Sequence, residues 1–202
     1  MKLDKLLVTV ALLALTCTAR ANLLVNGSFE SPAIAPGTFS LFSSIPGWSI
    51  ASGPFIEIQN HVAGSPHEGN QYLELDSTAN TSVYQDVPTV TGASYLLTLW
   101  YSPRPGIAAA SNGVNLIVDG TSNTLLIGEG IGHSDTVWTQ YSFSLIGNGS
   151  TRIEFAGVGI SDSLGGYIDA VSLTSVPEPS MLLLLAAAGL AASTFLRRRH
   201  TV

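Results

Sequence analysis

Between residues 22 and 176 the chain alternates apolar and polar residues in short runs, and none of these runs continues with a helical period. Turn-forming stretches such as "SPRPG", "VDGTSN", "GNGS" and "DSLGG" separate the runs, which therefore predict short β-strands. Nine or more short strands without intervening helices predict an all-β fold, an antiparallel β-sandwich or jelly roll. The predicted strands lie at 55–59, 71–75, 82–87, 94–102, 113–119, 124–128, 137–147, 151–157 and 166–173.

The run "YLLTLWYS" within the predicted strand 94–102 separates two faces most clearly. Trp100 lies on one face beside small polar residues, opposite an apolar face that is the predicted core face. A flat ring in such surroundings predicts either stacking on a sugar or cover for a groove of the second sheet. The residues predicted to face the core are Tyr95, Leu97, Leu99 and Tyr101.

The first 21 residues have the form of a secretory signal peptide. Two lysines precede the apolar run Leu6–Leu15, and Ala19 and Ala21 form the small-x-small pattern of a signal-peptidase site. Cleavage after Ala21 leaves a mature chain that begins at Asn22. The one cysteine of the sequence, Cys17, is removed with this leader.

The other end of the chain carries a second apolar run, Met181–Leu196, which has no charged residue. As a helix it would be roughly 24 Å long, slightly less than the hydrocarbon core of a bilayer. Length alone leaves open a buried core helix. Three arginines follow the run, and each would cost about 2.5–3.5 kcal/mol at the bilayer centre. The sequence therefore predicts a single transmembrane helix over 181–196, after a Pro-rich spacer at 175–180 and before a basic cytoplasmic tail at 197–202.

The charge of the exported part excludes one class of partner. Residues 22–196 contain two basic and thirteen acidic residues, a formal charge of −11, and no lysine. Such a surface repels phosphate backbones and attracts cations, so nucleic-acid binding is excluded.

Candidate ligand-binding residues surround the predicted aromatic platform. Trp100 would stack on a sugar ring, Arg104 offers a forked set of donors, and Gln59 and Asn112 offer amides. Glycoside hydrolysis is the lesser alternative, because it needs a pair of carboxylates and Glu57 and Glu74 both lie on predicted strands. The other acidic candidates are Asp76 and Glu154. No serine-nucleophile motif, zinc spacing or phosphate-binding context strengthens an enzymatic interpretation, and we predict that the protein is not an enzyme.

Three stretches of the body resemble galactose-binding-like β-jelly rolls of the carbohydrate-binding-module type: "NLLVNGSFESP", "EGNQYLELDS" and "GGYIDAVSL". The resemblance implies that the first and last strands lie close together and that a structural calcium ion fastens them. The ligands that it implies are the carboxylates of Glu30 and Asp169, with backbone oxygens near Ser28 completing the shell. Calcium takes 6–8 oxygen ligands and needs only a few carboxylates, which agrees with this set.

The tail resembles the PEP-CTERM sorting signal of Gram-negative bacteria. It combines Pro177-Glu178-Pro179, the apolar run and the basic cluster Arg197, Arg198 and Arg199 in the order of that signal. The resemblance implies an exosortase partner in the inner membrane, transient anchoring there, and delivery to the cell envelope or the extracellular matrix. Such systems accompany exopolysaccharide production.

Taken together, these features predict a signal peptide at 1–21, one jelly-roll domain at 22–174 and a sorting tail. We predict a non-enzymatic matrix protein that binds exopolysaccharide or another glycan. The alternative is a structural matrix protein without a specific ligand, bridged through calcium by its acidic surface.

Overall fold

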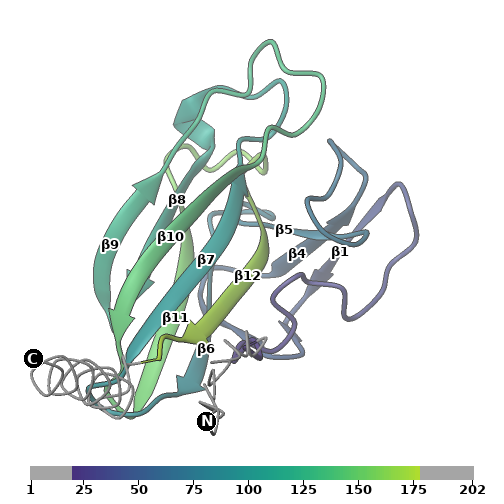
Figure 1. Ribbon diagram of the computed structural model, residues 1–202. Coiled ribbons are helices and arrows are strands. Elements are labelled where there is room, and N and C mark those ends of the chain that lie inside the picture. The colour runs from purple at the N-terminus through teal and green to yellow at the C-terminus, as the bar shows by residue number, and fades with distance from the viewer. Residues whose placement is uncertain (1–19, 178–202) are drawn as a thin grey trace, which may run out of the picture.

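Two six-stranded antiparallel sheets pack face to face in the computed structural model, which describes residues 20–177 (Figure 1). The front sheet has the order β1-β4-β5-β12-β7-β10, and the back sheet has the order β2-β3-β6-β11-β8-β9. The predicted all-β antiparallel sandwich is therefore confirmed. The strands are β1 (Thr38–Phe42), β2 (Ser44–Ile45), β3 (Trp48–Ser52), β4 (Ile56–Asn60), β5 (Tyr72–Glu74), β6 (Ser82–Pro88), β7 (Ser94–Ser102), β8 (Gly113–Val118), β9 (Thr121–Leu126), β10 (Thr139–Ile146), β11 (Ser150–Val158) and β12 (Tyr167–Ser175).

Several terminal features that the sequence predicts lie outside the described residues. They are the signal peptide up to Ala19, the membrane helix at 181–196, the basic cluster Arg197–Arg199, and Glu178 and Pro179 of the sorting signal. Among residues 20–177, the structure contains no helix with the length and apolar character needed to cross a membrane.

Strands β4 to β12 correspond to the nine predicted runs, and their ends differ from the predicted ones by at most three residues. The prediction missed β1, β2 and β3, and a short 3₁₀ helix, η1 (Ala109–Ser111). Strand β3 joins the back sheet only through its pairing with β6, and β1 joins the front sheet through β4. The Ser- and Gly-rich sequence between residues 37 and 53 carries a weak strand preference of its own, so this pairing decides its conformation.

The core lies between the sheets and follows the period-two pattern. In β7, Tyr95, Leu97, Leu99 and Tyr101 are at most 4% exposed, as predicted, while Trp100 on the other face is half-buried. Trp48 is 1% exposed, and its ring lies 5.4 Å from Phe29 and 5.9 Å from Phe155. It therefore joins the N-terminal segment to the back sheet.

The N-terminal segment fastens directly onto β12. The Asn22 side chain donates to the carbonyl of Val171 at 2.9 Å and accepts the backbone N–H of Leu173 at 2.9 Å. The N–H of Leu23 donates to the carbonyl of Leu173, and that of Val171 donates to Gly27. The two ends of the domain lie side by side and are joined by direct hydrogen bonds.

This junction gives a stability prediction for Gly27. A Cβ atom at Gly27 would lie 2.0 Å from the carbonyl oxygen of Val171, a backbone atom that cannot move without disturbing β12. We expect Gly27→Ala to lower the free energy of unfolding by about 1–3 kcal/mol, as overpacking does. Guanidinium denaturation measures this difference. Gly128→Ala is the matched control, because its Cβ meets only a proline side chain at 3.2 Å or more. Equal stability of the two variants would contradict the close approach.

Candidate functional site

The outer face of the front sheet holds the chemically richest part of the molecule. Alternation sends Ile58, Leu73 and Ile168 inward, so that their strand neighbours on β4, β5 and β12 point outward. Many of these outward side chains are polar and yet buried, because the loops 61–71 and 103–112 cover them. The buried polar residues of this face are Glu57, Gln59, Tyr72, Glu74, Tyr167 and Asp169.

An aromatic cluster lies on this face beside the loop 61–71. The imidazole of His67 stacks on the Trp100 ring with centroids 3.8 Å apart and planes 18° apart. Trp138 stands nearly perpendicular to His67, with centroids 6.2 Å apart and planes 74° apart. The Tyr72 ring lies edge-on to Trp138 at 6.0 Å. His67 is exposed, and Trp100 and Trp138 are half-buried, so the cluster is accessible from solvent.

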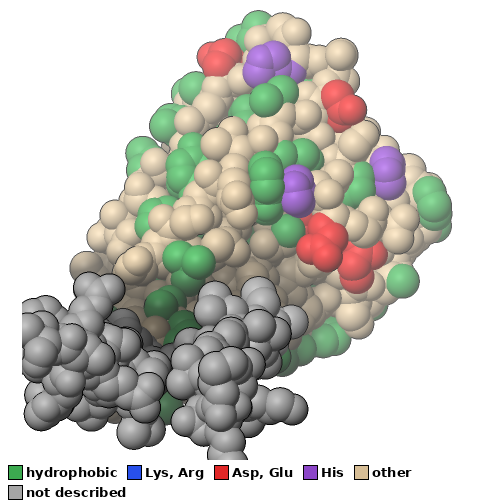
Figure 2. All heavy atoms as spheres, in the orientation of Figure 1, with side chains coloured by type: hydrophobic (Ala, Val, Ile, Leu, Met, Phe, Trp, Pro, Cys, Tyr) green, Lys and Arg blue, Asp and Glu red, His purple; other side chains and the backbone are tan. Residues whose placement is uncertain are grey.

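Figure 2 shows this face in space-filling form. A histidine lies beside hydrophobic side chains near the middle of the face, and a group of acidic side chains lies next to it. No Lys or Arg atoms are visible among the described residues in this view. The part of this face that is visible around the histidine thus carries acidic rather than basic side chains.

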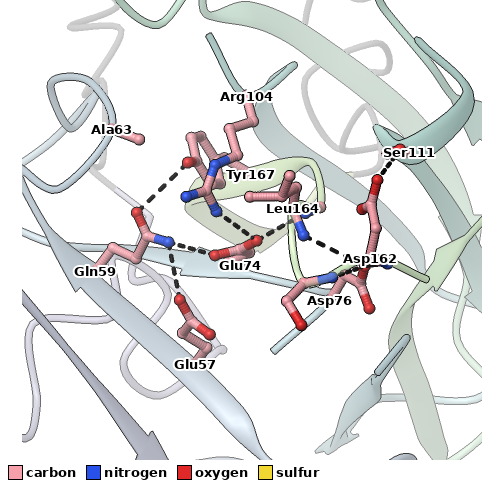
Figure 3. A network of polar contacts seen from close by, with 12 residues as sticks. Glu57, Gln59, Ala63, Glu74, Asp76, Arg104, Ser111, Asp162, Leu164 and Tyr167 are labelled. Carbon is pink, nitrogen blue, oxygen red and sulfur yellow. Dashed lines mark hydrogen bonds and ion pairs between the residues drawn. The ribbon is translucent and has the colours of Figure 1, made fainter. Parts of the chain in front are cut away.

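Below the cluster, a closed polar network joins β4, β5 and β12 (Figure 3). The Gln59 amide nitrogen donates to the Glu57 carboxylate at 2.9 Å and also to Glu74. Its amide oxygen accepts from the phenols of Tyr72 at 3.2 Å and Tyr167 at 3.4 Å. A single amide therefore holds two carboxyl groups and two phenols in place.

Arg104 closes the network from the loop that follows β7. Its guanidinium donates to Glu74 at 2.8 Å, and the two side chains are 15% and 0% exposed. The Gly165 N–H donates to the same Glu74 oxygen at 2.7 Å. The ion pair is thus largely desolvated, and removal of either partner leaves a buried charge without compensation.

Two carboxyl groups in one buried network cannot both ionise easily. Glu57 and Glu74 lie directly opposite each other in the β4–β5 register. Burial, together with the hydrogen-bonded Glu57 carboxyl, raises the pKa of Glu74 well above its ordinary value. One positive charge on Arg104 faces this pair, so the pair retains a proton at neutral pH.

Asn112 organises the loop that carries Arg104. Its side-chain oxygen accepts the Arg104 N–H at 2.8 Å, and its nitrogen donates to the carbonyls of Ile107 and Ala108. Asn112 is 0% exposed and Gln59 is 1% exposed. Of the four sequence-predicted ligand residues, these two therefore support the site from beneath, and Arg104 joins them at its edge. Only Trp100 belongs to the exposed aromatic cluster.

The three sequence-predicted calcium ligands gather around the turn 67–71. One oxygen of Asp169 accepts the N–H groups of His67 and Glu68 at 2.9 Å each. One oxygen of Glu30 accepts those of Asn70 and Gln71 at 2.8 Å each. The Ser28 hydroxyl donates to the Glu68 carboxylate at 2.8 Å. These side chains clamp the turn.

Asp169 reaches the turn because β12 is irregular at this point. The β12–β7 register shifts between Asp169 and Ser172, and Ala170 adopts a positive φ of 47°. Burial raises the pKa of Asp169 to about 7, although the backbone N–H groups of Glu68, Ala170 and His67 oppose this change. Asp169 also pairs in register with Trp100, so the same residue positions both rings of the stack.

His67 and Trp138 are site residues that the sequence prediction did not assign to the site. No local pattern in the sequence predicts the contact between these two residues. The signal that could have found them is the position of Trp100. A ring on the outer face of a central strand needs neighbours, and His67 lies in the loop that leads into β5, which only β12 separates from β7.

The shared proton of the carboxyl pair gives a pH prediction. Because the folded-state pKa of Glu74 is raised, the unfolded chain binds fewer protons above about pH 4.5 and stability falls as the pH rises. Glu57→Gln keeps the Arg104–Glu74 ion pair and removes the competing carboxyl group. We expect the fall in unfolding free energy from pH 5 to pH 8 to shrink by more than about 1.4 kcal/mol, the equivalent of one pKa unit.

Urea denaturation at the two pH values measures this change. Glu154→Gln, on β11 of the back sheet, is the matched control and should keep the wild-type slope. An identical slope for Glu57→Gln and the wild type would show that the pair does not share a proton.

Curated relatives match the body of the chain. One is a multifunctional-autoprocessing repeats-in-toxin protein of Vibrio vulnificus, 30% identical over 158 residues that make up 76% of this chain. A protein of the same description from Vibrio cholerae matches over the same length. The chain spans about 3% of the length of these relatives.

Solved structures share the fold. The Stig cyclase Fisc from Fischerella sp. TAU, in complex with an indole derivative, matches with a TM-score of 0.57 and 16% identity over 79% of this chain and 99% of its own. A family 16 carbohydrate-binding module matches with a TM-score of 0.47 and 17% identity over 76% of this chain and 99% of its own.

The tail has a match of its own. The family model described as the PEP-CTERM protein-sorting motif matches residues 175–199, which begin at the last residue of β12. This stretch contains the Pro-Glu-Pro sequence, the apolar run and the arginine cluster, in agreement with the sequence prediction. The chain therefore carries a PEP-CTERM protein-sorting motif directly behind a β-jelly-roll domain.

Proposed function

We propose that the protein is an exported, non-enzymatic glycan-binding protein of a Gram-negative bacterium, and that its ligand is an extracellular polysaccharide. The observation that carries this proposal is the accessible aromatic cluster of Trp100, His67 and Trp138 on the outer face of the front sheet. The sorting motif supports the destination, because such a tail implies processing by an exosortase and delivery to the envelope or matrix.

The geometry of the cluster suits the apolar face of a pyranose ring. His67 covers one face of the Trp100 ring, so the exposed His67 ring would form the floor with Trp100 supporting it, and Trp138 would form a wall nearly perpendicular to it. The exposed Gln140 lies opposite Trp100 in the β10–β7 register and offers an amide to sugar hydroxyls. Contacts of this kind are individually weak, and a polymeric ligand that engages many copies strengthens them.

Binding fits this face better than hydrolysis does. Glu57 and Glu74, the carboxyl groups that could form a hydrolytic pair, are 5% and 0% exposed and are joined through Gln59. A glycosidase needs its two carboxyl groups on either side of an accessible glycosidic bond. The carboxyl pair instead lies beneath the cluster and stabilises the loops that carry it.

The first test removes the ring that supports the aromatic floor. We expect Trp100→Ala to weaken binding to polysaccharide purified from the producing organism by about tenfold or more, a loss of roughly 1.4 kcal/mol. Titration calorimetry or affinity electrophoresis measures the change, and circular dichroism checks the fold. Tyr84→Ala is the matched control, because Tyr84 is a half-buried aromatic residue on the back sheet that stacks with Arg152 at 3.8 Å.

Unchanged binding in Trp100→Ala would refute the proposed binding face. Retention that survives this substitution and follows only divalent cations would support the alternative, a structural matrix protein without a specific ligand. Release of reducing ends from the polysaccharide would instead support hydrolysis.

We also propose that a structural calcium ion binds at the turn 67–71. The oxygen-bearing side chains around this turn support the proposal. Glu30, Asp169 and Ser28 would hold it together with backbone oxygens, and calcium would supply further charge compensation between the N-terminal segment and β12. Within residues 20–177, no three His, Cys, Asp or Glu side chains lie close enough to form a metal cluster by themselves. Calcium binding would therefore need backbone oxygens as additional ligands. It would also need the Glu30 and Asp169 carboxylates to give up hydrogen bonds to the N–H groups of the turn.

A melting experiment tests the ion. Calcium at a hundredfold excess over its dissociation constant stabilises the folded state by about 2.7 kcal/mol, which raises the melting temperature by roughly 5–10 °C for a domain of this size. Glu30→Gln should abolish this rise, and Glu129→Gln, in an exposed loop, should leave it unchanged. If calcium fails to raise the melting temperature of the wild type, the turn is held by its hydrogen bonds alone.

A further inference from the structure

We infer that the end of the front sheet next to the sorting motif rests on the lipid surface while the chain is anchored. This inference rests on the proposed export and anchoring, and it concerns a surface away from the aromatic cluster. The surface is the lipid-facing patch, which we define as Leu23, Val90, Leu96, Ile146 and Val176.

The patch consists of apolar side chains that the fold leaves uncovered. Their exposed fractions are 38% for Leu23, 68% for Val90, 37% for Leu96, 63% for Ile146 and 44% for Val176. Scattered exposed apolar residues need no explanation, but a contiguous group of them marks an interaction surface.

Strand pairing brings these residues together. Ile146 lies opposite Ser94 on β7, and the Val176 N–H donates to the carbonyl of Ser94 at 2.8 Å. Leu96 is two residues further along β7, on the same face, so it is a diagonal neighbour of both. The three apolar side chains thus come from β10, β7 and the residue that follows β12, and Figure 1 shows these three strands next to one another.

The other two patch residues flank this group. A Cβ at Gly147 would lie 2.5 Å from the carbonyl oxygen of Val90, which places the β6–β7 loop against the end of β10. The N–H of Leu23 donates to the carbonyl of Leu173 at 2.9 Å, and Leu24 beside it is buried. Leu23 therefore turns away from the core along β12.

The strip around the patch also carries no charge. Near the tail, the outward residues of β7, β10 and β12 are hydroxyl-bearing or apolar, and none of these described residues is acidic or basic. The exported part as a whole, by contrast, has a formal charge of −11. An anionic lipid surface repels carboxylates, so the uncharged strip is the part of this acidic body that can approach it. The residues of the strip are Ser94, Leu96, Thr98, Ser142, Ser144, Ile146, Ser172, Thr174 and Val176.

The short spacer brings this strip to the bilayer. Val176 is a member of the patch, and the apolar run of the sorting motif begins five residues later, at Met181. Five residues span at most about 18 Å even when fully extended. The amino-terminal end leaves from the same place, since the Arg20 guanidinium donates to Ser175 at 3.2 Å. A body held this closely by its tail presents its nearest surface, the lipid-facing patch, to the headgroups.

Contact with lipid would let the patch fix the orientation of the body on the membrane. Aliphatic side chains that enter the headgroup boundary lose contact with water and restrain the rotation of the body. The patch would thereby hold the spacer with its Pro-Glu-Pro sequence at a defined height above the bilayer. After cleavage the mature domain leaves the membrane, because five partly exposed side chains without basic residues bind lipid only weakly.

Site-specific fluorescence quenching tests this inference with the full chain. Once the leader is removed no cysteine remains, so Ile146→Cys provides a single labelling position. The tail-bearing protein is inserted into vesicles of phosphatidylcholine and phosphatidylglycerol that contain a headgroup-level quencher lipid. We expect the label at position 146 to lose about half of its fluorescence or more, because interfacial apolar groups lie roughly 5–10 Å into the headgroup boundary. Leu125→Cys, 53% exposed on β9 of the back sheet, is the matched control and should be unaffected.

A second variant separates lipid contact from accidental proximity. With the label at position 146, Leu96→Asp together with Val176→Asp should reduce the quenching at least about threefold, because charge disfavours the interface. Flotation of the vesicles reports anchoring independently. A chain that floats without quenching at position 146, or with equal quenching at position 125, overturns the patch and leaves the proposed anchoring intact. A chain that does not float overturns both, and disulfide-linked pairs of the unlabelled Ile146→Cys variant would assign the patch to a second copy.

Discussion

Strand β12 is the element on which the rest of the molecule depends, and its junction with the N-terminal segment holds it in place. Asn22, Leu23 and Gly27 bond to its backbone, while β5 and β7 pair with its two edges. Its outward side chains Tyr167 and Asp169 enter the polar network and the turn 67–71. Its last residue begins the sorting motif. One strand therefore links the core, the candidate site and the tail.

The outer face of the front sheet shows how a polar surface can be buried without a large loss of stability. Each polar group of the network has a defined partner: Gln59 serves two carboxyl groups and two phenols, and Arg104 serves Glu74. A retained proton on the carboxyl pair reduces the charge that must be desolvated. Buried networks of this kind fix one arrangement of the covering loops, since any other arrangement leaves charged groups unpaired.

The two ends of the front sheet have different surface chemistry. Acidic and aromatic side chains gather near the turn 67–71, whereas the strip near the tail is uncharged and partly apolar. This separation fits the anchoring that we propose, in which the tail would hold one end of the sheet near the bilayer. The aromatic cluster would then point away from the membrane, toward the polysaccharide that we propose as its ligand.

The sequence by itself determined the features that depend on neighbouring residues. Alternation in "YLLTLWYS" identified the buried face of β7 and the outward position of Trp100, and nine of the twelve strands followed from the same pattern. The order of motifs in the tail identified the sorting signal. Side-chain alternation is a local property of an extended chain, so it can be read without knowledge of the fold.

Only the tertiary structure decided which outward residues are covered. Gln59 and Asn112 look like exposed amides in the sequence and are buried, because loops from other parts of the chain lie over them. The stack of His67 on Trp100 depends on Asp169, which is 102 residues from His67. The strands β1 to β3 and the lipid-facing patch likewise arise from pairing between distant segments. Such contacts have no local periodicity, and the sequence therefore contains no pattern from which to predict them.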